Sequence, residues 1–280
     1  MIKAPINKII DQSFVDGPGN RTAVFFQGCN YHCAYCHNPE TINLCMNCGL
    51  CVETCPVHAL SLVDGKVVWN EDLCCKCDTC LKTCPHLSSP RVKWMTADEV
   101  FERIKRNAPF IKGISTSGGE CTLYKPFLIE LFGKVRSLGL TALIDSNGSM
   151  DFRNNQDLLD ACDGVMLDVK STDTEEYCSL IGGDGSGIMD KAIYLASLGK
   201  LTEVRTVCSP DFSSEKTVDD VSRSLAEYQN KGDIHYRIIS YRHYGVREPY
   251  RQAIKEPSPY WMAHLEQTAR NNGMTHVTVV

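Results

Sequence analysis

The sequence predicts an α/β protein in which helices cover a mainly parallel sheet and a cysteine-rich segment is inserted near the N-terminus. Two observations indicate this fold. Short apolar runs alternate with amphipathic helical patterns along most of the 280 residues, which is typical of parallel strands joined by helical crossovers. In addition, eleven of the 16 cysteines stand at motif spacings between Cys29 and Cys84.

The elements follow from the apolar periodicity. A helix over 96–107 begins with Thr96 as N-cap and Glu99 three residues later, a capping box, and further helices are expected over 125–138, 156–162, 187–198 and 215–231. Six strand–helix units can form a doubly wound sheet or an incomplete barrel, and the pattern does not choose between them. The predicted strands cover 21–28, 110–119, 140–148, 164–170, 201–210 and 234–242.

Polar clusters follow these strands, including STSGGE, DSNG and DVK. Both folds bind ligands at the carboxyl ends of their strands. We therefore expect the site at this edge of the sheet, facing the first cysteines.

Charge and hydropathy limit the class of protein. The net charge is −5, whereas a nucleic-acid-binding protein normally carries a basic stripe. The N-terminus lacks an apolar signal segment, and no run approaches the 18 or so apolar residues of a membrane span. We expect a cytoplasmic protein with neither a nucleic-acid nor a membrane partner, in which 16 cysteines indicate metal ligands rather than disulfides.

The stretch GCNYHCAYCHNP (28–39) contains Cys29, Cys33 and Cys36. A structural zinc site would need a fourth ligand, which His32 or His37 could supply. A cubane iron–sulfur cluster held by three thiolates would instead leave one iron open to a substrate. The position of the loop after an apolar strand, beside polar strand ends, favours the second interpretation.

A second cysteine pattern is an internal repeat. CMNCGLCVETCP (45–56) and CCKCDTCLKTCP (74–85) both read C-x-x-C-x-x-C-x-x-x-C-P and flank a hairpin-like segment with a DG turn. This run resembles bacterial two-cluster ferredoxins, in which the last cysteine of each run ligates the other cluster; a paired zinc module is the weaker alternative. The resemblance implies one cluster on Cys45, Cys48, Cys51 and Cys84, and a second on Cys74, Cys77, Cys80 and Cys55.

Five cysteines stand outside both patterns. Cys75 is interpreted as a spare thiol, and Cys121 directly follows SGGE. The others are interpreted as small buried apolar residues: Cys162, Cys178 and Cys208.

The triplet C-x-x-x-C-x-Tyr-C, with Tyr35 before Cys36, resembles the signature of radical S-adenosylmethionine (SAM) enzymes. The resemblance implies a [4Fe–4S] cluster on the three cysteines, with the amino and carboxylate groups of SAM on the fourth iron. SFVDGPGNRTAVFFQGC is similar to the glycyl radical enzyme activases, such as pyruvate formate-lyase activating enzyme, and YRHYGVRE with the repeat resembles their YjjW-type branch. The implied fold is a partial six-unit (β/α) barrel over 1–43 and 91–280, with a ferredoxin-like insert over 44–90.

The same resemblance implies the remaining site residues. Taken one at a time, each motif could instead be a turn, a solvated strand end or, for Arg205, a surface arginine. Asp16 in VDGPG matches the position that contacts the partner's glycine loop, with a turn-forming aspartate as its alternative. A monovalent cation is expected at Asp145, Ser146, the Met166 carbonyl and Asp168. The SAM pocket is expected to contain Tyr35, His37, Gly118, Gly119, Glu120, Asp168, Val169, Lys170, Arg205 and either Arg242 or His243.

The implied reaction is reductive cleavage of SAM to methionine and a 5′-deoxyadenosyl radical, which takes a hydrogen from the α-carbon of a glycine in a partner enzyme. The insert would relay electrons from a flavodoxin or ferredoxin, under anaerobic conditions. Two alternatives remain. One is another radical SAM reaction, on a small molecule or peptide. The other is a ferredoxin-type electron carrier, which would leave the triplet, SGGE and DVK without a role.

Overall fold

The computed structural model describes residues 2–280, in which nine strands form one sheet in the order β11-β10-β9-β8-β7-β6-β2-β1-β5. On one side of the sheet, β1 (Lys3–Ser13) pairs antiparallel with both β2 and β5 (Lys93–Thr96). The other strands run parallel to one another, as the sequence predicts: β2 (Arg21–Phe26), β6 (Gly113–Gly118), β7 (Thr141–Ser146), β8 (Gly164–Asp168), β9 (Leu201–Cys208), β10 (His235–Ser240) and β11 (His276–Val279).

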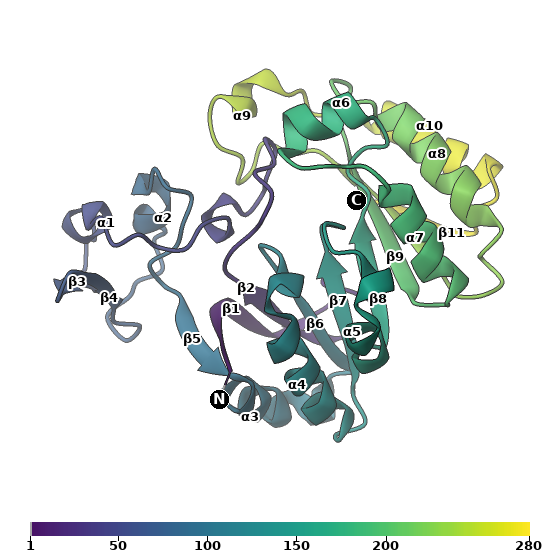
Figure 1. Cartoon of the computed structure of the whole chain (residues 1–280). Helices are drawn as coiled ribbons and strands as arrows, with labels where there is room; N and C mark the ends of the chain where they lie inside the picture. Colours follow the sequence, from purple (N-terminus) through teal and green to yellow (C-terminus); the bar gives the residue numbers. More distant parts are fainter. Residues whose placement is uncertain (1) are drawn as a thin grey trace.

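Helices cover the outer face of this sheet (Figure 1). The main core lies between them and the strands, and includes Leu128 and Leu131 of α4 and Val165 and Leu167 of β8. The predicted capping box is confirmed, since Thr96 and Glu99 exchange hydrogen bonds at the start of α3. The longer helices are α3 (Ala97–Asn107), α4 (Lys125–Arg136), α5 (Gln156–Ala161), α7 (Ile188–Ser197), α8 (Ser214–Ala226) and α10 (Pro259–Asn271), and the short ones are α6 (Thr174–Glu176) and α9 (Tyr250–Ala253).

The inner face of the sheet is polar and curved. Asp145 of β7 and Arg205 of β9 form an ion pair of 2.8 Å across the intervening β8. Arg237 of β10 donates a hydrogen bond of 3.1 Å to the carbonyl of Val15, which precedes β2 at the far side of the sheet. The parallel strands follow one another in chain order from β2 and β6 to β11, without the reversal of a doubly wound sheet. The sheet is therefore the barrel alternative, and it is incomplete because β11 and β5 are left as edges.

Residues 44–90, called the insert segment below, stand apart from the sheet (Figure 1). The predicted hairpin is present as β3 (Leu60–Val63) and β4 (Lys66–Trp69). Both turn residues, Asp64 and Gly65, have positive φ, as a two-residue hairpin loop of type I′ requires. The segment also contains α1 (Leu50–Glu53) and α2 (Thr79–Thr83).

Hydrogen bonds and ion pairs hold the insert segment against the rest of the chain, among them Arg91 with Asp78 and Lys93 with Glu71. The Asn43 backbone N–H donates to Leu87 O at 3.0 Å, so the two ends of the segment lie side by side. The Arg247 guanidinium donates to the carbonyls of Leu81 and Lys82 at the end of α2. No helix within residues 2–280 is long and apolar enough to cross a membrane.

Candidate active site

The first cysteine loop begins where β2 ends, at the carboxyl edge of the parallel strands. Its two ends are joined by a hydrogen bond of 2.8 Å from Gly28 N to Thr41 O. The buried Gln27 side chain donates to the carbonyls of Glu40 and Asn43, both at 2.6 Å. Gln27 therefore links the loop to the start of the insert segment, a role that its place at the end of an apolar strand did not indicate.

The three cysteines of this loop are half-buried. Burial raises the pKa of Cys29 to about 11 and that of Cys36 to about 12, and it also raises that of Cys33. The Lys170 ammonium opposes this rise at all three sulfurs. Thiolates in this loop thus require nearby positive charge, which bound iron would supply together with Lys170.

Lys170 and Asp168 form an ion pair of 2.8 Å at the end of β8. Burial alone would lower the pKa of Lys170, but Asp168, Cys33 and Tyr35 hold it well above its usual value. The DVK motif thus supplies a charged ammonium that acts on the cysteine loop, and its place in the SAM site stays a prediction.

Asn147 contacts the cysteine loop, which the sequence did not predict. Its side-chain amide donates to Cys29 Sγ at 3.6 Å and to Asn30 Oδ1 at 3.1 Å, and its backbone N–H donates to Glu120 at 2.7 Å. The polar cluster DSNG at the end of β7 was the available signal, but it did not say which side chain reaches the loop.

Glu120 is fully buried, and burial raises its pKa even though four hydrogen bonds reach it. Its carboxylate accepts from the Thr122 backbone and hydroxyl, from Ser146 and from Asn147. The carboxylate therefore organises the strand ends around the cysteine loop, and its predicted contact with the SAM amino group remains a prediction.

Glycine is required at both positions of SGGE by a close approach of the backbone. A Cβ on Gly118 would lie 2.3 Å from the backbone of Phe26, and one on Gly119 would lie 2.1 Å from Gly28 O. The close approach that requires glycine is thus made by the end of β2 rather than by a ligand. Their place in the SAM pocket stays a prediction.

Arg205 lies in a buried ion network. It donates to Asp145 at 2.8 Å, to Met166 Sδ at 3.2 Å and to Glu203. Burial alone would lower the pKa of Arg205, but the two carboxylates raise it above its usual value. A surface arginine, the alternative interpretation, is excluded.

The predicted cation ligands lie at neighbouring strand ends, since Asp145 pairs in register with Met166 on β8. Both carboxylates are engaged in ion pairs, Asp145 with Arg205 and Asp168 with Lys170. The Ser146 hydroxyl donates to Glu120 rather than toward Asp145. The cation site remains a prediction.

The loop that follows β10 also packs against the cysteine loop, at His37. The Arg242 carbonyl lies 3.0 Å from His37 Nε2, and the Tyr241 and His37 rings lie 6.2 Å apart. His243 contacts Ile254 O at 2.8 Å and its backbone N–H donates to Glu256, while the Arg242 side chain is exposed. These contacts do not decide which of the two residues would reach SAM.

Asp16 is not brought to the cysteine loop. It lies before β2 whereas Cys29 follows β2, and its carboxylate accepts from Ser13 Oγ at 2.5 Å. This local contact is the turn that the alternative interpretation described. The Asp16 carbonyl also accepts from Ser115 on the inner face of the sheet.

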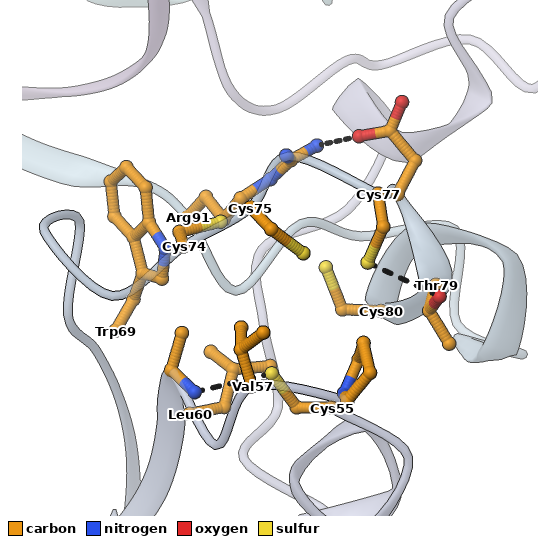
Figure 2. Close-up of a pocket in the computed structure, with 13 residues that line it drawn as sticks. Cys55, Val57, Leu60, Trp69, Cys74, Cys75, Cys77, Thr79, Cys80 and Arg91 are labelled. Atoms are coloured by element: carbon orange, nitrogen blue, oxygen red, sulfur yellow. Dashed lines mark hydrogen bonds and ion pairs between the residues drawn. The ribbon is translucent and has the colours of Figure 1, made fainter.

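The insert segment contains two hollows, each with about 310 Å³ of space that is partly open to solvent. Their cysteines are grouped as the ferredoxin pattern implies, with the last cysteine of each run at the other run's hollow. The first hollow is lined by Cys45, Cys48, Cys51 and Cys84. The second is lined by Cys55, Cys74, Cys77 and Cys80, together with Cys75 (Figure 2).

Within residues 2–280, no three Cys, His, Asp or Glu side chains are arranged to bind a single metal ion. A single zinc ion needs its thiolates within about 2.3 Å of one point, whereas each thiolate of a cubane binds a different iron. This finding therefore does not test the cluster interpretation.

The site residues also fit a polar cofactor beside a cluster. The Tyr35 hydroxyl is buried and has no hydrogen-bond partner within residues 2–280. Tyr35, Tyr177 and Tyr241 belong to a buried cluster that packs against Cys29 and Cys33. A thiol triplet, a buried ammonium and an unsatisfied hydroxyl thus meet in one water-poor place.

The cysteines outside the patterns have structural roles or none. The Cys121 thiol is buried and donates to the carbonyls of Thr116 and Asp145, so it fastens two strand ends. Cys162 and Cys208 are buried as expected, but Cys178 is exposed. The prediction for Cys178 was wrong because the chain there forms a short π-helical turn over Tyr177–Ile181 that leaves it on the surface.

Comparisons with known proteins show the family of the chain. The family model "Radical SAM superfamily" matches residues 23–222. A Haemophilus influenzae protein, named provisionally as a glycyl-radical enzyme activating enzyme, is 27% identical over 302 residues, covering 100% of this chain and 97% of the relative. A pyruvate formate-lyase-activating enzyme of Clostridium pasteurianum is 27% identical over 220 residues, covering 77% and 73%.

Solved structures share the fold. A domain of the pyruvate-formate lyase-activating enzyme of Bacteroides vulgatus has a TM-score of 0.51 and 16% identity, covering 60% of this chain and 98% of that one. A spore photoproduct lyase has a TM-score of 0.56 and 14% identity, covering 97% and 78%. The chain belongs to the radical SAM superfamily and resembles its glycyl radical enzyme activating enzymes.

Proposed function

We propose that the chain is a glycyl radical enzyme activating enzyme that cleaves SAM reductively and removes a hydrogen from the α-carbon of a glycine in a partner enzyme. The observation that carries the proposal is the packing of Asn147 and of the buried tyrosine cluster against the cysteine loop. Similarity to an activating enzyme over the whole chain supports the same function.

In this proposal Cys29, Cys33 and Cys36 hold a [4Fe–4S] cluster and SAM binds beside it. Together the cluster and SAM supply a 5′-deoxyadenosyl radical. The chain's own residues would bind the cluster and SAM and hold them in position. Lys170 offsets negative charge near the thiolates, and Asn147 donates to the Cys29 sulfur. The tyrosine cluster around the loop excludes water.

The insert segment is proposed to carry two further clusters, one in each hollow, and to relay electrons from a flavodoxin or ferredoxin. The grouping of its cysteines supports this role, because the ferredoxin pattern places the last cysteine of each run on the other cluster. Arg247 would hold the relay in place through its bonds to α2.

Asp16 is proposed to contact the partner's glycine loop. Two apolar side chains beside it are exposed, Phe14 by 74% and Val15 by 70%. Exposed apolar side chains next to a polar turn suit a docking surface.

The proposal is tested with a glycyl radical enzyme encoded near this gene. Anaerobic incubation with SAM and a chemical reductant should produce a glycyl radical signal in electron paramagnetic resonance of the partner. Omitting SAM, or replacing Cys33 by Ala, should abolish the signal. A partner that stays silent while SAM is consumed would instead favour a radical SAM reaction on another substrate.

A further inference from the structure

The second hollow of the insert segment contains one thiol more than the ferredoxin pattern uses. Its lining includes Cys74 and Cys75, consecutive residues of which the pattern assigns only the first. The first hollow is lined by four cysteines. The two halves of the repeat are thus unequal in thiols although the hollows are of similar size.

The backbones of the two halves are equivalent. Positive φ angles recur at the same distances from the first cysteine of each run. They are 61° and 56° at the second residue after it, 82° and 59° at the fourth, and 50° and 49° at the thirteenth. Non-glycine residues rarely adopt positive φ, so the shared positions indicate one repeated backbone. The pairs are Asn47 and Lys76, Gly49 and Asp78, and His58 and Leu87.

Cys75 in the second run is therefore equivalent to Met46 in the first run, since each directly follows the first cysteine of its run. Both line their hollows. The repeated backbone therefore presents this side chain to the hollow in both halves, and only in the second half does it end in a thiol.

The two neighbouring thiols approach the hollow from different sides. Figure 2 shows the Cys75 sulfur pointing into the hollow toward Cys80, while the Cys74 sulfur lies beside Trp69 and Arg91. Cys75 is exposed and Cys74 is half-buried. A cluster in this hollow would be faced directly by the Cys75 sulfur, while the Cys74 sulfur lies on the side of Trp69 and Arg91.

We propose that Cys75 is an alternative ligand of the cluster in the second hollow and takes over the iron of Cys74 when Cys74 is lost. The inference rests on the proposed function, which assigns clusters to the insert segment. In the exchange the Cys75 thiol loses its proton to solvent as its Fe–S bond forms. The Fe–S bond of Cys74 breaks and its thiolate takes up a proton, so no electron is transferred. The first hollow has no such reserve.

The test compares matched variants of the full-length protein, reconstituted anaerobically, by iron and sulfide content. Wild type should hold about 12 irons in three clusters. Cys45→Ser should lose about four of these irons, whereas Cys74→Ser should keep all of them. Cys74→Ser/Cys75→Ser and Cys74→Ser/Cys75→Met should both fall to about eight.

Two further readouts separate ligation from structural effects. Met46→Cys should restore about four irons to Cys45→Ser, because it supplies the missing reserve thiol. In alkylation of the folded holoprotein, Cys75 should react in wild type and be protected in Cys74→Ser. Circular dichroism checks that each variant is folded.

Equal iron loss in Cys74→Ser and Cys45→Ser, or an alkylated Cys75 in Cys74→Ser, would overturn the inference. A different iron content is expected if the insert segment carries no clusters at all, which is the failure of the proposed function. Wild type would then hold only about four irons, and Cys45→Ser would change nothing, which would remove the basis for a ligand role of Cys75 as well.

Discussion

The side-chain amide of Asn147 donates a hydrogen bond to the sulfur of Cys29 at 3.6 Å. The same residue donates its backbone N–H to the buried carboxylate of Glu120. The end of β7 thereby connects the glycine-rich end of β6 to the first cysteine of the loop. Asn147 is thus one of the residues through which the strand ends position the loop.

Asn147→Ala should make the cluster of the first loop harder to reduce while leaving its iron content unchanged. An N–H donor to a ligating sulfur stabilises the reduced, more negative state. Loss of one such bond, worth about 1 kcal/mol, corresponds to a shift of about 40 mV to more negative potential. Spectroelectrochemical titration measures it, with Ser149→Ala as the control. An unchanged potential would show that the bond has no electronic effect.

Lys170→Ala should weaken SAM binding by about 10- to 100-fold, the value of a charge-assisted bond, without changing the iron content. Lys125→Ala, which removes a partly exposed ion pair with Asp157, is the control and should bind normally. The Lys170 pKa is raised well above its usual value, so binding should not weaken between pH 7 and pH 9 through loss of this charge. Calorimetry measures both effects. Normal SAM binding by Lys170→Ala would exclude the D-x-K assignment.

Glu203→Gln should destabilise the barrel by about 3 kcal/mol. Burial alone would raise the pKa of Glu203, but His235 and Arg205 lower it to about 2. A depressed pKa contributes stability above the unfolded pKa of about 4.3, which is lost as the pH falls through the folded value. The cost of the substitution should therefore be equal at pH 7.5 and pH 9, since both lie above this window and above the range in which histidine partners change charge. Urea unfolding of the two proteins tests this, and a cost that changes between these pH values would contradict the assignment.

Cys55→Ala should remove the cluster of the second hollow although Cys55 belongs to the first run. Alkylation should then find Cys77 and Cys80 reactive while Cys48 and Cys51 stay protected. Cys84→Ala is the reciprocal variant and should give the opposite pattern. If each substitution exposed the cysteines of its own run, the crossed ligand sets would be wrong.

Replacing Cys48 and Cys77 by Ala should separate electron supply from radical chemistry. This variant should cleave SAM with a strong chemical reductant but turn over poorly with flavodoxin or ferredoxin. Release of 5′-deoxyadenosine measures both rates. Equal rates with the two reductants would exclude the relay, and loss of both would show that the insert segment helps to build the active site.

Much of the fold could be predicted because its strands are short apolar runs with a helix after each. The strands that were missed lack this context. β1 and β5 form the antiparallel side of the sheet, and β11 pairs only with β10. Their partners lie far away in the sequence, so local periodicity does not identify them.

The cysteine groups could be predicted because the repeat resembles two-cluster ferredoxins, in which the last cysteine of each run joins the other group. Asn147 and Gln27 could not, since both act through long-range hydrogen bonds that residue type alone does not indicate. The need for glycine in SGGE could not be predicted either, because it comes from the close approach of the end of β2, and the place of these glycines in the SAM pocket stays a prediction.

The central claim is that this chain removes a hydrogen from a glycine α-carbon. The most direct measurement uses a partner glycyl radical enzyme labelled with α-deuterated glycine, incubated anaerobically with SAM, reductant and this protein. Mass spectrometry of the released 5′-deoxyadenosine should find deuterium from the partner, and the yield should follow the glycyl radical signal. Unlabelled 5′-deoxyadenosine, released while the partner keeps its deuterium, would contradict the account.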